Sequence, residues 1–508
     1  MMSKVSKNIL FNLVGQLLIV LLGFWGTRLV FHKLGDEALG ILYFALAIYA
    51  VLLPILDLGV SSTIVREVAC HRHTDPKYLF DLVRTGTLFY WSGYAALSAG
   101  VWITAPWLVS RWINLKAFDA SVAVHALRIL ALALLLMLPR SFYSNLIRGM
   151  EHMEFNNFIE VGTTALQQGG TILILMYGGG LVQIAYCYLA SLLLSNLAYI
   201  AITGYFFSWR SLFPSFTSGV LNRNLSFTSH MAAFSVLAMI QMESDKALIS
   251  KLLPIALVGF YGLAQTMVAR VSRVPAAINQ AAFPNFSALF HKGDQIGLMR
   301  QYHRLQDLVC YGLVPIFAAI IFAARPLFTY LLNAQASEIL LLPTALLCVG
   351  WYMNGTVNMP LALSLAVGRP DINARLNFYA LFITLPATAW FIWKWGLVGA
   401  GLSSVFYHLY IYGYAVRRWA SECMGMPASA WYFHVLKFLL VAAVTYGSMW
   451  LVFERIDRDS ILCLASAYLL GSIAYLCGAY LVLGEDLRQG FVGLRGKVTG
   501  GVLRMNSN

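Results

Sequence analysis

Fourteen apolar stretches, each long enough to cross a lipid bilayer, decide what this chain can fold into. A membrane-spanning helix needs about 20 mostly apolar residues, because each residue advances about 1.5 Å through a hydrocarbon layer about 30 Å thick. The stretches lie at residues 8–30, 37–64, 80–108, 120–146, 155–177, 181–207, 227–250, 255–283, 306–325, 338–366, 373–393, 397–416, 432–452 and 461–483. They predict an all-α, polytopic membrane protein.

Composition supports the same fold class. Of the 508 residues, 59% are hydrophobic and 11% are charged, whereas a soluble domain carries about 25% charged residues. So few charges cannot cover a water-exposed surface, which excludes soluble globular, disordered and secreted disulfide-rich classes. The formal net charge of +13 is then a property of the loops and requires no nucleic-acid partner.

The distribution of Lys and Arg predicts the orientation. If the N-terminus is cytoplasmic, the inside segments hold most of the bases that lie outside the helices, as cytoplasmic loops usually do. We therefore expect both termini in the cytoplasm. The first apolar run is too long for a signal peptide and lacks a small-residue cleavage site, so it is predicted to be a retained helix.

The first twelve spans are predicted to be two copies of a six-helix unit. Leu34–Tyr43 recurs in outline at Leu253–Gly262, and Gly149 and Gly368 share the same offset. An even number of helices keeps the copies parallel, related by an axis along the membrane normal. The expected fold is two parallel-repeat six-helix bundles around a central cavity, plus two extra C-terminal helices. The expected domains are an N-terminal lobe at residues 1–207, a cytoplasmic linker at 208–224, a C-terminal lobe at 225–420, and two additional helices with a cytoplasmic tail at 421–508.

The sequence offers no site for covalent chemistry. No predicted loop is long enough for a catalytic domain, which counts against a glycosyltransferase, polymerase or ligase. The chain lacks the GxxxxGK[ST] phosphate loop, an HExxH pair and any CxxC spacing, which are the motifs for Walker-type ATP binding and for common metal sites. We therefore predict no catalytic residue, no metal and no cofactor, and a carrier or a scaffold remains.

Ionisable side chains within the spans are the candidate functional residues. Each costs about 2.5 to 3.5 kcal/mol to insert at the centre of a spanning helix, so such groups tend to face a wet cavity or one another. Arginine presents a planar fork of donors to phosphate oxygens, so a cationic cavity between the two halves would suit an anionic head group. The predicted substrate-binding residues are Arg28, Arg128, Lys246, Arg270 and Arg273, and the predicted coupling or gating residues are Asp57, Glu243 and Asp245.

Simpler interpretations of these charges stay open. Arginines near helix ends can extend to the lipid head groups at little cost. Glu243, Asp245 and Lys246 can form a local ion pair with i, i+3 spacing, and Asp57 can mark a helix end. The repeat also places Arg28 and Ala247 at equivalent depth, so we expect Arg28 to approach Asp245 and Lys246.

Several short motifs resemble a known family. They are Thr27-Arg28-Leu29-Val30, Leu34-Gly35-Asp36-Glu37-Ala38-Leu39-Gly40, Leu56-Asp57-Leu58-Gly59, Val65-Arg66-Glu67, Ser244-Asp245-Lys246-Ala247-Leu248-Ile249 and Val258-Gly259-Phe260-Tyr261. Together they resemble the polysaccharide-export branch, with the Wzx-type oligosaccharide flippases, of the superfamily that also holds multidrug and toxin extrusion carriers.

The resemblance implies a two-lobed helical carrier in the bacterial inner membrane. It would flip a polyprenyl-diphosphate-linked oligosaccharide for O-antigen, capsule or exopolysaccharide synthesis, with membrane lipids and the polysaccharide polymerase machinery as further partners. Arg28, Asp57, Arg66, Asp245 and Lys246 match the charged pattern of the family, whereas Arg128, Arg270 and Arg273 rest on the depth argument alone.

Related functions share this fold and remain alternatives. A lipid II flippase would also use a basic cavity, and a multidrug exporter would favour an acidic, aromatic cavity for cations. Coupling to protons or to sodium is equally open. The barrier in each case is the transfer of a polar head group through hydrocarbon, which a cavity with alternating access removes without covalent chemistry.

Overall fold

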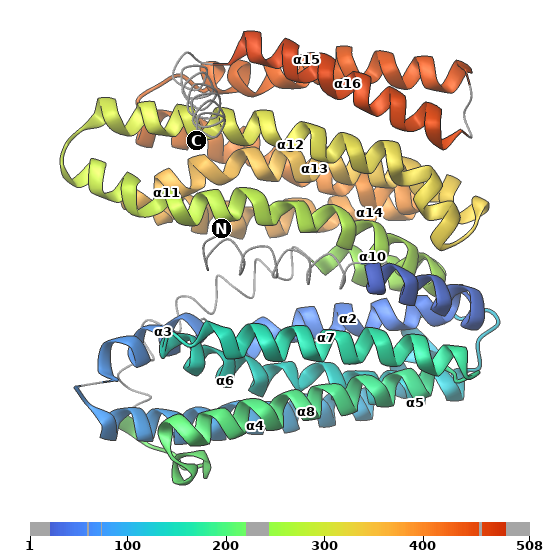
Figure 1. The fold of residues 1–508 in the computed structure, drawn as a ribbon, viewed down its shortest axis with the longest axis vertical. Coiled ribbons are helices and arrows are strands. Elements are labelled where there is room, and N and C mark those ends of the chain that lie inside the picture. The colour runs from blue at the N-terminus through green and yellow to red at the C-terminus, as the bar shows by residue number, and fades with distance from the viewer. Residues whose placement is uncertain (1–20, 58–59, 73, 220–242, 457–459, 484–508) are drawn as a thin grey trace, which may run out of the picture. The chain divides into compact units, whose positions relative to one another are not determined.

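The computed structural model describes residues 21–57, 60–72, 74–219, 243–456 and 460–483 (Figure 1). Most of these residues are helical, and within these ranges the only strand-like pairing is an isolated bridge between Asn114 and Pro254. The predicted all-α fold class is confirmed. Among the described residues, seven helical segments are long and apolar enough to cross a membrane: Ala120–Gly149, Leu181–Phe207, Gln295–Leu331, Ala334–Ala366, Asp371–Met424, Ala428–Ile456 and Ile461–Val482. The total of fourteen spans stays a prediction.

The chain divides into two compact units. Unit 1 comprises Met1–Gly262 with Tyr330–Leu332, and unit 2 comprises Leu263–Thr329 with Asn333–Asn508. The domain limits inferred from the internal repeat stay a prediction, and the linker at 208–224 lies partly outside the described residues.

Unit 1 contains the helices of the first half of the chain. They are residues 21–34, α2 (Asp36–Asp57), α3 (Val60–His71), α4 (Pro76–Trp107), α5 (Ala120–Leu135), α6 (Met137–Gly149), α7 (Met153–Met176), α8 (Leu181–Phe207), residues 243–252 and the start of α10 (Ile255–Ala269). A short π-helix, Leu108–Trp112, follows α4, and a 3-10 turn, Trp209–Leu212, follows α8. The predicted span at 120–146 is thus two helices in direct succession, α5 and α6.

Large aromatic side chains fill the core of unit 1. Tyr90 of α4 and Phe142 of α6 are fully buried, and their rings stack with centroids 5.1 Å apart. Next to them, the indole nitrogen of Trp91 donates a hydrogen bond of 3.0 Å to the hydroxyl of buried Tyr143. Trp91 and Tyr143 therefore satisfy each other's polar groups within this core, as buried Trp and Tyr side chains usually require.

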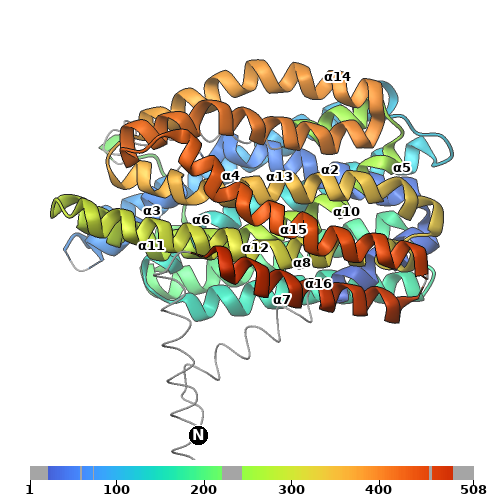
Figure 2. The same cartoon turned by 90° about the horizontal axis from the view of Figure 1, so that it is seen from above.

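Unit 2 contains the remaining helices. They are the end of α10, α11 (Arg273–His291), α12 (Gln295–Leu331) as far as Thr329, α13 (Ala334–Ala366), α14 (Pro370–Ile411), α15 (Ala428–Ile456) and α16 (Ile461–Val482). Helix α13 packs along α14, and α15 lies beside α16 in both views (Figure 1, Figure 2). Two π-helical segments, Tyr412–Val416 and Trp419–Met424, follow α14.

Side-chain caps and glycines set several helix ends. Asp75 caps α4 by accepting the Tyr78 amide at 3.0 Å, and Asn333 caps α13 by accepting the Ala336 amide at 2.7 Å, which satisfies donors that a helix start leaves unpaired. Within α14, Gly396 is non-helical with φ 58°. Glycine adopts this conformation without a Cβ penalty. The predicted boundary between the spans at 373–393 and 397–416 therefore coincides with a real break.

Two glycines that the repeat makes equivalent lie against each other. A Cβ on Gly40 of α2 would collide with the carbonyl oxygen of Ile255, and a Cβ on Gly259 of α10 would lie 2.8 Å from the Gly40 amide nitrogen. The backbones of α2 and α10 therefore approach more closely than side chains would allow, as small residues permit in membrane proteins.

We predict that Gly40→Ala and Gly259→Ala each destabilise the protein by about 1 to 3 kcal/mol or more, because backbone atoms cannot move aside as a side chain can. Thermal unfolding of the purified protein in detergent measures the loss. Gly100→Ala in α4 is the matched control, since its Cβ meets nothing within 4 Å. Equal melting of the three variants would contradict the close crossing.

Candidate functional site

Glu243, Asp245 and Lys246 form a compact charged cluster on the helix at residues 243–252 of unit 1. The Lys246 ammonium forms an ion pair with the Glu243 carboxylate three residues earlier, and these side chains are 15% and 12% exposed. Asp245 faces α10 instead, where its Oδ2 accepts a hydrogen bond of 2.7 Å from the Tyr261 hydroxyl. The i, i+3 ion pair considered from the sequence is therefore present between Lys246 and Glu243.

Arg28 has a different environment. Its guanidinium donates to the carbonyl oxygen of Tyr330, and its Cζ lies 4.0 Å from the centroid of the Tyr330 ring. Among the residues that the structure describes, no carboxylate lies within ion-pair distance of Arg28, and no hydrogen bond joins it to Asp245 or Lys246. Arg28 is thus held by a carbonyl dipole and a π face, which leave its positive charge uncompensated.

Arg128 repeats this arrangement on α5. Its Nε donates to the carbonyl oxygen of Trp102 in α4 at 3.0 Å, and its Cζ lies 4.9 Å from the Trp102 ring. One turn earlier, His125 Nε2 lies 3.3 Å from the Tyr186 hydroxyl on α8. His125 and Arg128 therefore contact different helices.

Arg270 and Arg273 belong to unit 2 and lie where the helix changes type. Helix α10 ends at Ala269, a 3-10 turn covers Arg270–Ser272, and α11 begins at Arg273. Both arginines are exposed. Asp57 is the last residue of α2, and its side chain lies outside what the structure describes. Of the eight predicted residues, Glu243, Asp245 and Lys246 are brought together within one unit.

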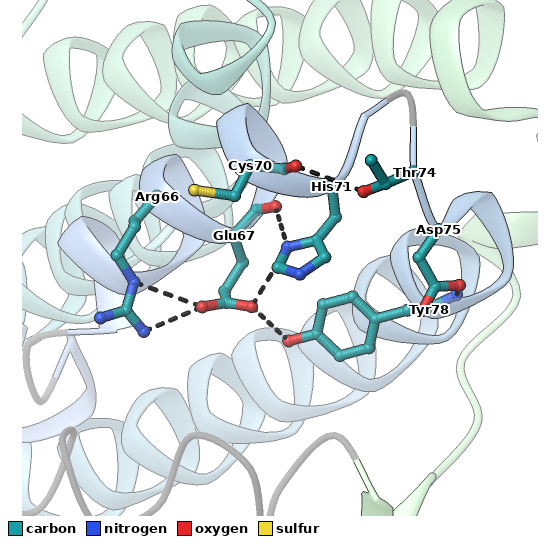
Figure 3. A network of polar contacts seen from close by, with 7 residues as sticks. All are labelled: Arg66, Glu67, Cys70, His71, Thr74, Asp75 and Tyr78. Carbon is teal, nitrogen blue, oxygen red and sulfur yellow. Dashed lines mark hydrogen bonds and ion pairs between the residues drawn. The ribbon is translucent and has the colours of Figure 1, made fainter.

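A second charged cluster surrounds Glu67 at the end of α3 (Figure 3). The Glu67 side chain is 7% exposed, and its carboxylate pairs with the Arg66 guanidinium at 2.8 Å. The same carboxylate accepts a hydrogen bond of 3.0 Å from the Tyr78 hydroxyl of α4 and lies 3.5 Å from His71 Nδ1. Arg66 was expected from the family pattern, but the central role of Glu67 was not.

A third carboxylate anchors a loop. Glu37 at the start of α2 is 7% exposed, and it accepts the amides of Lys116 and Phe118 at 2.6 Å each, as well as the amide of Ala117. The loop ends at Asp119, which caps α5. The Ser121 hydroxyl and two backbone amides stabilise the charged Asp119 carboxylate and lower its pKa. Glu37 stands in the motif that repeats at Leu253–Gly262 and that also carries the family resemblance, but neither signal predicted its contact with this loop.

Two solved structures share this fold. A structure described as "Lipid II flippase MurJ, inward closed conformation" superposes with a TM-score of 0.70 and 12% identity over 93% of this chain and 98% of that one. An inward-facing multidrug resistance MATE family transporter of the MOP superfamily superposes with a TM-score of 0.64 and 14% identity over 77% and 93%. The helices thus define a multi-pass membrane protein with the transporter fold of this superfamily.

The sequence comparisons give the family. The family described as "Polysaccharide biosynthesis protein" matches residues 33–340, which is more than half of the chain. A relative from Shigella flexneri named "Putative O-antigen transporter" is 21% identical over 408 residues, covering 79% of this chain and 94% of the relative. This chain belongs to the polysaccharide biosynthesis protein family, and the resemblance seen in the sequence motifs is confirmed.

We predict that Lys246→Met destabilises the protein and that Glu243→Gln in the same chain largely restores it. Removing one partner of a buried ion pair costs about 3 to 5 kcal/mol because the other charge stays unpaired, whereas replacing both costs far less. Melting temperatures of the single and double variants in detergent test this. Glu151→Gln is the control, since its ion pair with Arg72 involves a carboxylate that is 79% exposed and contributes less than about 1 kcal/mol. A double variant as unstable as Lys246→Met would contradict the pairing.

Proposed function

We propose that this protein flips a polyprenyl-diphosphate-linked oligosaccharide across the bacterial inner membrane by alternating access, for O-antigen, capsule or exopolysaccharide synthesis. Both termini then lie in the cytoplasm, and the protein is a transporter that performs no covalent chemistry. The family membership and the relative that aligns over 94% of its length support this proposal.

The observation that carries the proposal is the set of contacts that Arg28 and Arg128 make. Each lies in an apolar helix of unit 1, and each contacts a carbonyl oxygen and an aromatic ring. No carboxylate pairs with either within the described ranges. A guanidinium has five N–H donors. The hydrogen bond that each arginine makes to a described residue uses one of them, so donors and net positive charge stay available for a diphosphate.

The other predicted residues divide into two roles. Arg270 and Arg273 are exposed at the 3-10 turn of unit 2 and extend the proposed set of phosphate-binding groups. Lys246 was expected among these groups, but its ion pair with Glu243 favours a role with Glu243 and Asp245 in ion coupling or gating. Asp57 stays a proposed member of that second set.

The membrane potential supplies a driving force in this mechanism. An anionic head group that moves outward gains about 2.3 kcal/mol per elementary charge per 100 mV of inside-negative potential. The sugars and the diphosphate cross within the protein, which removes the cost of placing them in hydrocarbon, while the polyprenyl tail stays in lipid.

Purified protein in proteoliposomes tests the substrate class. We expect translocation of a polyprenyl-diphosphate-linked oligosaccharide, measured by its accessibility to a sugar-modifying reagent added outside. Lipid II and a cationic dye serve as the other two probes. Translocation of lipid II alone would replace the proposal with a peptidoglycan function, and transport of the dye alone would replace it with drug export.

We predict that Arg28→Ala and Arg270→Ala each reduce surface polysaccharide at least tenfold, while the protein still reaches the membrane. A hydrogen bond to a charged group contributes about 1.5 to 3 kcal/mol, and about 1.4 kcal/mol corresponds to a factor of ten. Polymer is measured on gels in a strain whose own copy of the gene has been deleted. Arg455→Ala, at the exposed end of α15, is the control. Normal polymer from both arginine variants would contradict the cationic pathway.

A further inference from the structure

Unit 2 contains a buried acid-base cluster, and none of its residues was among the functional residues predicted from the sequence. Asp307 lies on α12, and its side chain is 4% exposed. His434 and Lys437 approach it from α15, one helical turn apart, with side chains 18% and 26% exposed. Ionisable groups at such positions in a membrane protein are rare and usually functional.

The distances make His434 the nearest partner of the carboxylate. His434 Nε2 lies 2.9 Å from Asp307 Oδ1, and Lys437 Nζ lies 3.7 Å from the same oxygen. Lys437 also donates a hydrogen bond of 2.9 Å to the carbonyl oxygen of Val482 at the end of α16. The ammonium is therefore shared between a carboxylate and a helix C-terminus, which carries partial negative charge.

Neighbouring groups complete the environment. His303, one turn before Asp307, has its ring centroid 5.8 Å from that of His434, and Cys310 lies near Asp307 on the same helix. On the α15 side, the indole of buried Trp431 donates a hydrogen bond of 3.0 Å to Tyr302, which fixes α15 against α12. The positions of Asp307 and His434 are thus held by packing that does not depend on their charges.

The chemistry of the cluster favours a proton over a metal ion. Hard cations are bound by several oxygen ligands, whereas the Asp307 carboxylate pairs with the His434 imidazole and with the Lys437 ammonium. Over the residues that the structure describes, no three His, Cys, Asp or Glu side chains converge as a metal site. Imidazole is the side chain that gains and loses a proton near neutral pH.

We propose that Asp307, His434 and Lys437 form a proton-binding site in which His434 takes up the proton. With His434 neutral, Asp307 and Lys437 balance each other. His434 Nε2 lies within ion-pair distance of Asp307 Oδ1, and the neutral imidazole takes up one proton from water to give an imidazolium that stays on His434. Asp307 stabilises that cation and Lys437 opposes it, so the two neighbours tune the proton affinity in opposite directions.

The first test follows the titration of His434 by NMR in purified, ¹⁵N-histidine-labelled protein in nanodiscs, without substrate. His434→Gln identifies the signal by removing it. We expect Asp307→Asn to shift the midpoint of the titration down by about one pH unit or more, and Lys437→Met to shift it up by a similar amount. Asp307→Glu should retain the original midpoint approximately, and His291→Gln, in an exposed position, is the control.

The outcomes separate a proton site from a structural clamp. If the three residues only fasten α15 to α12, both variants lower the melting temperature while the midpoint stays in place, and the proposal is overturned. A signal that does not titrate between about pH 5 and pH 9, the range that small shifts of a histidine cover, also overturns it. If Asp307→Asn does not fold, the titration midpoint of His434 in Lys437→Met still tests the proposal: an upward shift supports the proton site, and an unchanged midpoint overturns it.

A second test asks whether the site drives transport, and this part rests on the proposed function. In proteoliposomes with a pH gradient, we expect wild-type protein to flip the polyprenyl-diphosphate-linked oligosaccharide faster than without the gradient, and His434→Gln to lose that response. If wild-type protein flips the substrate at the same rate with and without the pH gradient, the coupling is overturned. Absence of flipping in every variant, with the titration intact, overturns the proposed substrate and leaves the proton site standing.

Discussion

A polar side chain in a spanning helix cannot be satisfied by lipid, so its hydrogen bonds and its charge must be satisfied by the protein or by water in a cavity of the protein. This constraint explains the contacts that join helices within each unit. Tyr261 links α10 to the helix that carries Asp245, Arg128 links α5 to α4, and His434 links α15 to α12. Apolar packing brings these helices together, but polar pairing decides which residues face each other.

The charges are satisfied in two distinct ways, and the difference separates their proposed roles. Glu243 with Lys246 and Asp307 with His434 and Lys437 place opposite charges together, so their net charge is small and protons can change it. Arg28 and Arg128 lie against carbonyl oxygens and aromatic rings, which hold the guanidinium without neutralising it. The first arrangement suits ion coupling, and the second suits an anionic substrate.

Proteins with different cargo share this fold. Structures with TM-scores of 0.70 and 0.64 belong to a lipid II flippase and a multidrug resistance transporter, so one helical scaffold is used by proteins with different cargo. Function on such a scaffold is decided by the side chains that line the pathway. The family match adds the pathway class, polysaccharide biosynthesis, and the substrate that we propose within that class rests on the environment of the arginines.

The sequence by itself determined the all-α fold class, several helix boundaries and the family, because apolar length and short motifs are properties of contiguous residues. It also gave the pair of Glu243 and Lys246, since i, i+3 spacing brings two side chains together on any helix. Only the tertiary structure decided that Glu37 holds the 116–118 loop, that Arg28 lies against Tyr330 and that Asp307 meets His434. Those partners are far apart in the chain, and no local spacing encodes which helix faces which.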